Sequence, residues 1–314
     1  MLSPATRARH PRRALIALTA VSAAVTLGGC GALQDGAGGD GREVVASFYP
    51  LAWVTEQVAG DDWTVTNLTT PGGEPHDLEL GIGATADVAD ADLVVYLDGF
   101  QPAVDDAVAT NAGGETLDAA DVVDLQPVTD HAGDDHAEEH DHGDLDPHFW
   151  LDPLRMADLG DAVADELAAL DPDGAPDYRD RASQLRSQLE DLDGDYESGL
   201  ASCELDTVVV SHDAFGYLAR YGLHLEPING LSPDAEPNPA TLAELAGVIE
   251  DEGVTTVFSE RLASPALAET LASDLDVDTG VLDPIEGLTS ETTDEDYPSL
   301  MRENLDALQE ANRC

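Results

Sequence analysis

The stretch that decides the fold is TVVVSHDAFGYL, from Thr207 to Leu218. Its consecutive valines form a short β-branched run, which is typical of a strand buried in a parallel sheet. The polar triplet Ser-His-Asp follows and leads into a helix-like segment, so we predict His212 at the carboxyl end of the strand. Ligands bind at this edge in open α/β sheets, and an imidazole there can bind a metal ion. The stretch therefore predicts an α/β fold with a binding site at His212.

Three other stretches place a polar side chain on a strand-end loop. TTPGGEPHDLEL presents His76 from a Gly/Pro loop, and DLDPHFWLDP presents His148 between two Asp-Pro turns. VDTGVLDPIEG places Asp283 directly after an apolar run. A single histidine of this kind is more simply explained as part of a core. Three imidazoles and one carboxylate on such loops favour a shared site.

The first 30 residues have the pattern of an export signal. Four arginines precede the apolar stretch ALIALTAVSAAVTL, which is too short to span a bilayer. The ending Leu-Gly-Gly-Cys resembles the bacterial lipoprotein processing box, which implies cleavage before Cys30 and lipid attachment to its sulfur. The alternative is an ordinary signal with a chance cysteine. We expect a signal peptide over residues 1–29, a flexible tether over residues 30–42, and an exported protein anchored to the outer face of the cytoplasmic membrane.

Two cysteines remain once Cys30 is assigned to the lipid. An even number of cysteines in an oxidising compartment predicts a disulfide, here between Cys203 and Cys314. This bridge would tie the last residue of the chain to the segment before the His212 strand. The alternative is two free thiols that bind metal, but neither cysteine lies in a ligand-like motif.

The chain is strongly acidic. It has 13 basic residues, all of them arginine, against 65 acidic ones, and a formal net charge of −52. Nucleic acids and anionic ligands are excluded as partners, because affinity for phosphate depends on many Lys and Arg side chains. The field instead concentrates cations near the surface. A solvated surface suited to a salty or acidic habitat explains most of this charge, so the charge alone does not identify a metal site.

The rest of the chain divides into two α/β series joined by one helix. Strand-like and helix-like segments alternate in both series, which predicts two lobes, each a mainly parallel sheet flanked by helices. Between them, apolar residues recur every three or four positions from Tyr178 to Leu200, as in one long, rigid amphipathic helix. We expect an N-terminal lobe over residues 43–175, a linking helix over 176–202 and a C-terminal lobe over 203–314.

The segment 129–144 falls outside this plan. It has no apolar residue larger than alanine, so it cannot bury enough surface to fold, and we expect a mobile insertion. Its histidines alternate with Asp and Glu, which is the composition of a low-affinity metal-binding tract. The histidines concerned are His131, His136, His140 and His142. A plain solvated loop is the simpler alternative.

Several motifs in this order resemble the metal-binding subunits of bacterial zinc and manganese ABC importers. The resemblance rests on EPHDLEL, DPHFWLDP, SHDAFGYLARYGL, GLSPDAEPNP, TTVFSE and VLDPIEGL, and extends from about Val44 to Cys314. It implies two lobes joined by a single rigid helix, with the metal buried between them. The ligands that it implies are His76, His148, His212 and Asp283. Glu260 falls where the family has an acidic residue near the site, so we expect it beside the ligands, with direct ligation as the less favoured alternative.

The ligand types favour Zn²⁺ over Mn²⁺. Imidazole suits zinc, whereas manganese prefers carboxylate and carbonyl oxygens. In this family, members that import manganese often carry Glu at the position of His212. Each ligand histidine should donate its second ring N–H to a carboxylate or carbonyl. The adjacent candidates are Asp77, Asp152 and Asp213.

The predicted function is capture of Zn²⁺ by an exported monomer that delivers the ion to an ABC permease in the membrane. The alternatives are a manganese- or iron-delivering member of the same family, a surface adhesin or passive metal buffer, and a zinc hydrolase. A hydrolase would need an open coordination position and a general base. The sequence has no HExxH motif, and a fourth protein ligand would close the shell, so we expect no enzymatic activity.

Overall fold

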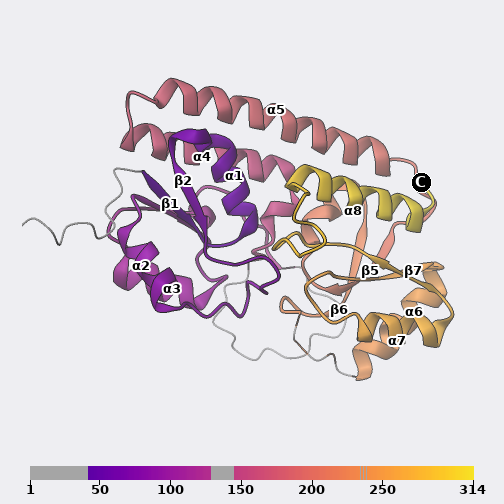
Figure 1. Ribbon diagram of the computed structural model, residues 1–314. Coiled ribbons are helices and arrows are strands. Elements are labelled where there is room, and N and C mark those ends of the chain that lie inside the picture. Colours follow the sequence, from indigo (N-terminus) through magenta and orange to yellow (C-terminus); the bar gives the residue numbers. More distant parts are fainter. Residues whose placement is uncertain (1–41, 129–144, 234, 236, 238) are drawn as a thin grey trace, which may run out of the picture. The chain divides into compact units, whose positions relative to one another are not determined.

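Figure 1 shows the computed structural model, which describes residues 42–128, 145–233, 235, 237 and 239–314. Gly41–Cys314 form one compact unit. The predicted signal peptide, most of the tether including Cys30, and the four histidines of segment 129–144 lie outside the described residues. Within the described ranges, no helix is both long and apolar enough to cross a membrane.

The first lobe is built on a parallel sheet of four strands in the order β2-β1-β3-β4. Alternate residues of its strands point to opposite faces. Val44 and Ala46 therefore join the core that contains α1, while Val45 packs with residues of α2 and α3. The strands are β1 (Glu43–Ala46), β2 (Thr64–Asn67), β3 (Leu93–Tyr96) and β4 (Glu115–Asp118), and the helices are α1 (Tyr49–Ala59), α2 (Ile82–Asp90) and α3 (Pro102–Asn111).

The second lobe repeats this plan with the strand order β6-β5-β7-β8, again all parallel. Val209 packs with residues of α6 and α7, whereas Val208 and Val210 face the core that contains α8. The strands are β5 (Thr207–His212), β6 (His224–Asn229), β7 (Thr256–Ser259) and β8 (Asp278–Val281), and the helices are α6 (Pro239–Glu252), α7 (Ala266–Leu275) and α8 (Tyr297–Asn312).

One long helix connects the lobes. Helix α5 (Ala175–Leu200) has 26 residues, so it is about 40 Å long, and Gly194 does not interrupt it. It packs against α1 and α4 (Pro153–Leu170) beside the first sheet and against α8 beside the second, as Figure 1 shows. Its apolar stripe belongs to a single hydrophobic core that includes residues of both sheets. The predicted fold class, including the long linking helix, is confirmed.

Several elements were not predicted from the sequence. Strand β6 contains Pro227, which cannot donate to a neighbouring strand, but β6 lies at an edge of the sheet where this is tolerated. Strand β4 has one buried residue, Leu117, so its sequence carries no apolar pattern. Helices α2 and α8 were also missed. The helix-like segment after His212 is a 3₁₀ helix, η4 (Gly216–Tyr221).

The predicted disulfide between Cys203 and Cys314 is present, and it joins residues 111 positions apart. The backbone N–H groups of Glu204 and Leu205 both donate to the carbonyl of Asn312, at 3.1 Å each. The end of α8 is therefore fixed to the segment that leads into β5.

Replacing both cysteines by alanine should lower the free energy of unfolding by about 2–4 kcal/mol, because the unfolded chain regains the freedom that a long closed loop removes. Urea denaturation at neutral pH measures this change. Reductant should shift the midpoint of the wild-type protein and leave that of the variant unchanged. Equal stability of the two proteins without reductant would contradict the prediction.

Candidate metal centre

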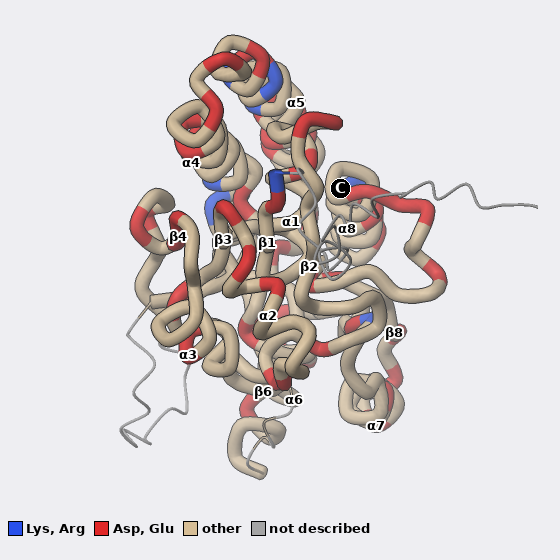
Figure 2. Tube along the Cα trace, turned by 60° about the vertical axis from the view of Figure 1, so that its left-hand side comes forward, with Lys and Arg blue, Asp and Glu red and all other residues tan. Residues whose placement is uncertain are grey.

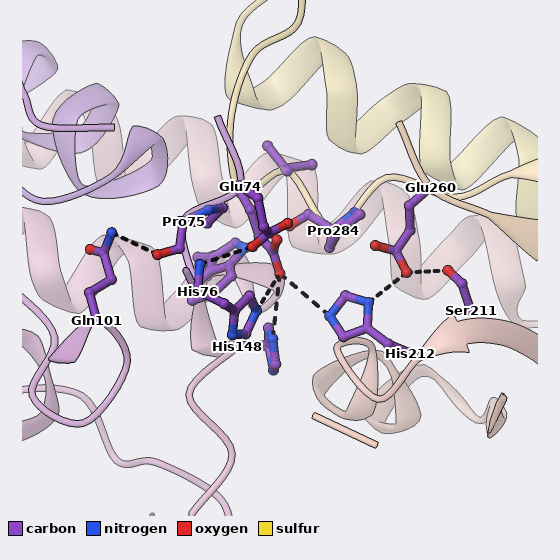
Figure 3. A network of polar contacts seen from close by, with 12 residues as sticks. Glu74, Pro75, His76, Gln101, His148, Ser211, His212, Glu260 and Pro284 are labelled. Carbon is purple, nitrogen blue, oxygen red and sulfur yellow. Dashed lines mark hydrogen bonds and ion pairs between the residues drawn. The ribbon is translucent and has the colours of Figure 1, made fainter. Parts of the chain in front are cut away.

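Three histidines and one glutamate meet where the carboxyl ends of the two sheets face each other. His212 is the last residue of β5, and His76 lies on the loop between β2 and α2. His148 directly precedes the 3₁₀ helix η3 (Phe149–Leu151), and Glu286 lies on the loop after β8. Figure 3 shows the three imidazoles turned toward one another. Each lobe therefore contributes two of the four side chains.

The Nε2 atoms of all three histidines surround one carboxylate oxygen, Oε1 of Glu286. The distances are 3.3 Å from His76 and 3.5 Å from both His148 and His212. A tetrahedral zinc ion with bonds of about 2.0–2.1 Å separates its ligand atoms by about 3.3 Å. The three distances to Oε1 are close to this value, and all four candidate ligand atoms lie within 4.8 Å of one another, so a zinc ion could bind among them.

Several polar atoms of these side chains have no hydrogen-bond partner among the residues that the structure describes. Within the described part of the chain, Nε2 of His148, Nε2 of His212 and Oε2 of Glu286 are buried and make no well-formed hydrogen bond. Buried polar atoms are normally paired, because an unpaired one costs about 1–3 kcal/mol. Two orphaned nitrogens that lie beside the same buried carboxylate fit a bound cation.

Carboxylates orient two of the imidazoles. Nδ1 of His148 lies 2.8 Å from Oδ1 of Asp146, and Nδ1 of His212 lies 2.5 Å from Oε1 of Glu260. Glu260 also accepts a hydrogen bond from the Ser211 hydroxyl. A carboxylate at Nδ1 fixes the ring so that Nε2 remains free for a metal, and it makes the ring a better ligand.

Burial and charge act in opposite directions on these groups. Burial alone would raise the pKa of Glu286, but the three histidines that face its carboxylate outweigh burial and hold the pKa well below its usual range. Burial alone would lower the pKa of His212, but Glu260 and Glu286 raise it to about 10. Asp146 and Glu286 likewise raise the pKa of His148 against the effect of burial. When no metal is bound, protons on these imidazoles therefore balance the negative charge of the carboxylates.

The loop that carries His76 forms one wall of the site. Nε2 of Gln101 donates to the carbonyl of Pro75 at 3.1 Å, as Figure 3 shows, and so holds the loop to the first lobe. The Gly72 N–H donates to the Leu288 carbonyl of the second lobe at 2.6 Å. The His76 side chain is 13% exposed, against 0–1% for the other three groups. Solvent therefore reaches the site at His76.

Beside His76, Glu74 is a further acidic group of the same loop. Its Oε1 accepts from the His76 backbone N–H at 2.9 Å. Burial, and then repulsion from Glu286, raises the pKa of Glu74 to about 7.

The structure brings together the three predicted histidines but places Glu286, not Asp283, beside them. Among the described residues, the group with metal-ligand spacing is His76, His148, His212 and Glu286. Oδ1 of Asp283 instead accepts from the Ile285 N–H at 2.8 Å, and Oδ2 lies 3.0 Å from Nε of Arg261. By this geometry Glu286 is a better candidate for the fourth ligand than Asp283, which was expected from the sequence. Glu286 stands three residues later in the same motif.

Of the residues predicted to lie beside the histidines and orient them, some contact an imidazole and others have different contacts. Glu260 contacts His212 as expected beside the site. Asp152 caps α4 and pairs with Arg155 and Arg220, and Asp77 is exposed. Asp213 is buried next to His212, and its backbone N–H donates to the Gly230 carbonyl. Asp146 and Glu74 were missed, although both lie two residues before a predicted ligand.

Two parallel α/β lobes, joined by a long helix and holding three imidazoles and a carboxylate between them, define a two-lobed metal-binding protein. Residues 44–311 match the family model of ZnuA, the periplasmic component A of the zinc-uptake complex. The chain belongs to this family.

Two curated relatives and one solved structure illustrate the similarity. The chain is 38% identical over 280 residues to the zinc-binding lipoprotein AdcA of Streptococcus pneumoniae R6, a match that covers 86% of this chain but only 56% of that protein. It is 35% identical over 288 residues to the high-affinity zinc uptake system protein ZnuA of Bacillus subtilis, covering 87% and 88%. The Zn(II)-bound ZnuA-like domain of pneumococcal AdcA superposes with a TM-score of 0.73 at 36% identity, covering 87% of this chain and all of that domain.

Zinc binding should release about one proton or more per ion at pH 7, because the raised pKa values of His212 and His148 mean that protons must leave before Nε2 can bind the metal. The apparent affinity should therefore rise with pH until His212 has titrated, near its pKa of about 10. Calorimetric titration in buffers of different ionisation enthalpy counts the protons. An observed enthalpy that does not depend on the buffer would contradict this.

Proposed function

We propose that this protein is the extracytoplasmic zinc-binding component of an ABC importer, which captures Zn²⁺ between its lobes and delivers it to a membrane permease. The observation that carries the proposal is the convergence of three Nε2 atoms, two of them buried, on one carboxylate oxygen, at 3.3–3.5 Å. The match to the zinc-uptake family supports the cargo and the importer. His76, His148, His212 and Glu286 are the proposed ligands.

The ligand set supports zinc over manganese. Three imidazole nitrogens and one carboxylate suit the borderline Zn²⁺ ion, whereas Mn²⁺ favours more oxygen ligands. Four protein ligands also fill a tetrahedral shell and leave no position for a reactive water, which a zinc hydrolase needs. The proposed activity is binding and delivery without catalysis.

Anchoring and delivery are parts of the same proposal. The Leu-Gly-Gly-Cys motif supports lipid attachment at Cys30, and the pneumococcal relative is named a lipoprotein. An anchor would hold the captured ion close to the permease. The long helix α5, packed against both lobes, resists wide hinge opening, so release is expected to involve small tilts and movement of the ligand loops.

Replacing His212 by alanine should weaken zinc binding by more than about 100-fold. The change removes a proposed ligand and the imidazole that lies between the Glu260 and Glu286 carboxylates. Calorimetric titration of metal-stripped protein with Zn²⁺, and separately with Mn²⁺, measures the change. His224→Ala is a matched control, since His224 is an exposed histidine at the other end of the second sheet. Equal loss in both variants, or tight binding that survives His212→Ala, would contradict the site; manganese bound as tightly as zinc would contradict only the cargo.

Deleting the gene should impair growth of the source bacterium in chelated medium, and added zinc should restore it. Copies with the wild-type sequence or His224→Ala should rescue growth, and a copy with His212→Ala should not. A Cys30→Ser copy should move from the membrane fraction to the soluble fraction and rescue less well. Full rescue by His212→Ala would count against import, and membrane retention of Cys30→Ser would count against the anchor.

A further inference from the structure

The loop that carries Glu286 contains a strained residue. Ile285 has a φ of +59° and is completely buried. The left-handed region is unfavourable for a β-branched residue, because its Cβ approaches the following carbonyl oxygen. Such a conformation persists only where its surroundings hold it. In this loop, the unusual turn immediately precedes the residue that reaches the metal centre.

Asp283 supplies the contact that holds the turn. Its Oδ1 accepts a hydrogen bond from the Ile285 N–H at 2.8 Å. Its Oδ2 lies 3.0 Å from Nε of Arg261, whose Nη2 in turn donates to Glu303 at 2.8 Å. Asp283 is only 3% exposed. Oδ1 is therefore engaged in the turn itself, whereas Oδ2 forms an ion pair with Arg261 without a well-formed hydrogen bond.

The backbone on either side of Asp283 is also fixed. The Asp283 N–H donates to Oδ1 of Asn304 at 2.8 Å, and Nδ2 of Asn304 donates back to the Asp283 carbonyl at 2.6 Å. Nε1 of Trp150, two residues after His148, donates to the Pro284 carbonyl at 2.7 Å. The peptides on either side of Asp283 are thus held by other residues. The orientation of the Ile285 peptide is set by its hydrogen bond to the Asp283 carboxylate.

We propose that Asp283 is a positioning residue for the metal centre: it accepts from the Ile285 N–H, stabilises the left-handed turn, and so directs Glu286 toward the three imidazoles. Arg261 keeps the carboxylate turned away from the metal. The inference rests on the proposed function, in which Glu286 is a ligand. It gives Asp283 an indirect role in zinc binding in place of the direct one expected from the sequence.

The test compares Asp283→Asn, Asp283→Leu and Glu286→Gln with the wild-type protein. Asparagine keeps an acceptor oxygen for the Ile285 N–H, whereas leucine has a similar volume and no acceptor. Zinc affinity is measured by competition with a chelator. The visible absorption of the Co²⁺-loaded protein reports the coordination geometry, because tetrahedral Co²⁺ absorbs far more strongly than octahedral Co²⁺.

Asp283→Asn should keep zinc affinity within about threefold and leave the Co²⁺ spectrum unchanged. Asp283→Leu should weaken affinity by about 10- to 100-fold, the range typical of groups that orient a ligand, and should alter the spectrum. Glu286→Gln should lose at least as much as Asp283→Leu. Rescue by asparagine separates positioning through a hydrogen bond from ligation by a charged oxygen.

Three results would overturn the inference. If Asp283→Asn loses zinc as severely as Glu286→Gln and changes the spectrum, Asp283 is itself a ligand. If Asp283→Leu binds zinc like the wild type, the carboxylate positions nothing. If the wild-type protein binds neither zinc nor Co²⁺, the proposed function fails, and this inference fails with it.

Folding of the variants is checked by thermal denaturation of the metal-free proteins. Asp283→Asn removes one of the two carboxylates that pair with Arg261, so the double variant Arg261→Met/Asp283→Asn is included. It removes the arginine charge and keeps the acceptor oxygen, and it should bind zinc like Asp283→Asn. Weak binding by this folded double variant would also overturn the inference, because the hydrogen bond to Ile285 would then be insufficient.

Discussion

The burial of the Glu286 carboxylate is the constraint on which the site depends. A buried negative charge is tolerated only when paired, and the three histidines are the groups that face it. Those histidines come from two loops of the first lobe and from the end of strand β5 in the second, so the charge can be balanced only when the lobes are correctly docked. The same requirement explains why Asp146 and Glu260 stand behind two of the imidazoles. Carboxylates and imidazoles alternate in the site, so the negative charge of the carboxylates must be balanced by a bound cation or by protons on the imidazoles.

A hydrophobic core shared by both lobes holds them in this arrangement. Residues of both sheets and of α1, α4, α5 and α8 belong to one hydrophobic cluster, so the lobes share packing that extends well beyond the ligand loops. Figure 2 shows acidic residues spread over the elements of the chain, with few basic ones among them. Repulsion among these charges opposes compaction, and the shared core and the disulfide counteract it.

The sequence was sufficient for the fold class and for the three histidines that the structure brings together, because buried strands and isolated strand-end histidines leave clear local patterns. It did not indicate that Glu286 is the carboxylate beside them. Asp283 and Glu286 lie three residues apart on one loop, with the left-handed turn at Ile285 between them, and an isoleucine in the sequence gives no sign of such a turn. Strand β6 was not predicted because it contains Pro227. A proline is tolerated in an edge strand, but only the tertiary structure shows that β6 lies at an edge.

The link between the two ligand loops at Gly72 and Leu288 joins one main-chain group to another. Neither partner titrates, so acid leaves this hydrogen bond intact while it protonates the imidazoles. This one contact between the lobes therefore does not depend on the charge state of the site. It can persist in the metal-free, protonated protein, in which the interactions among the imidazoles and carboxylates have changed.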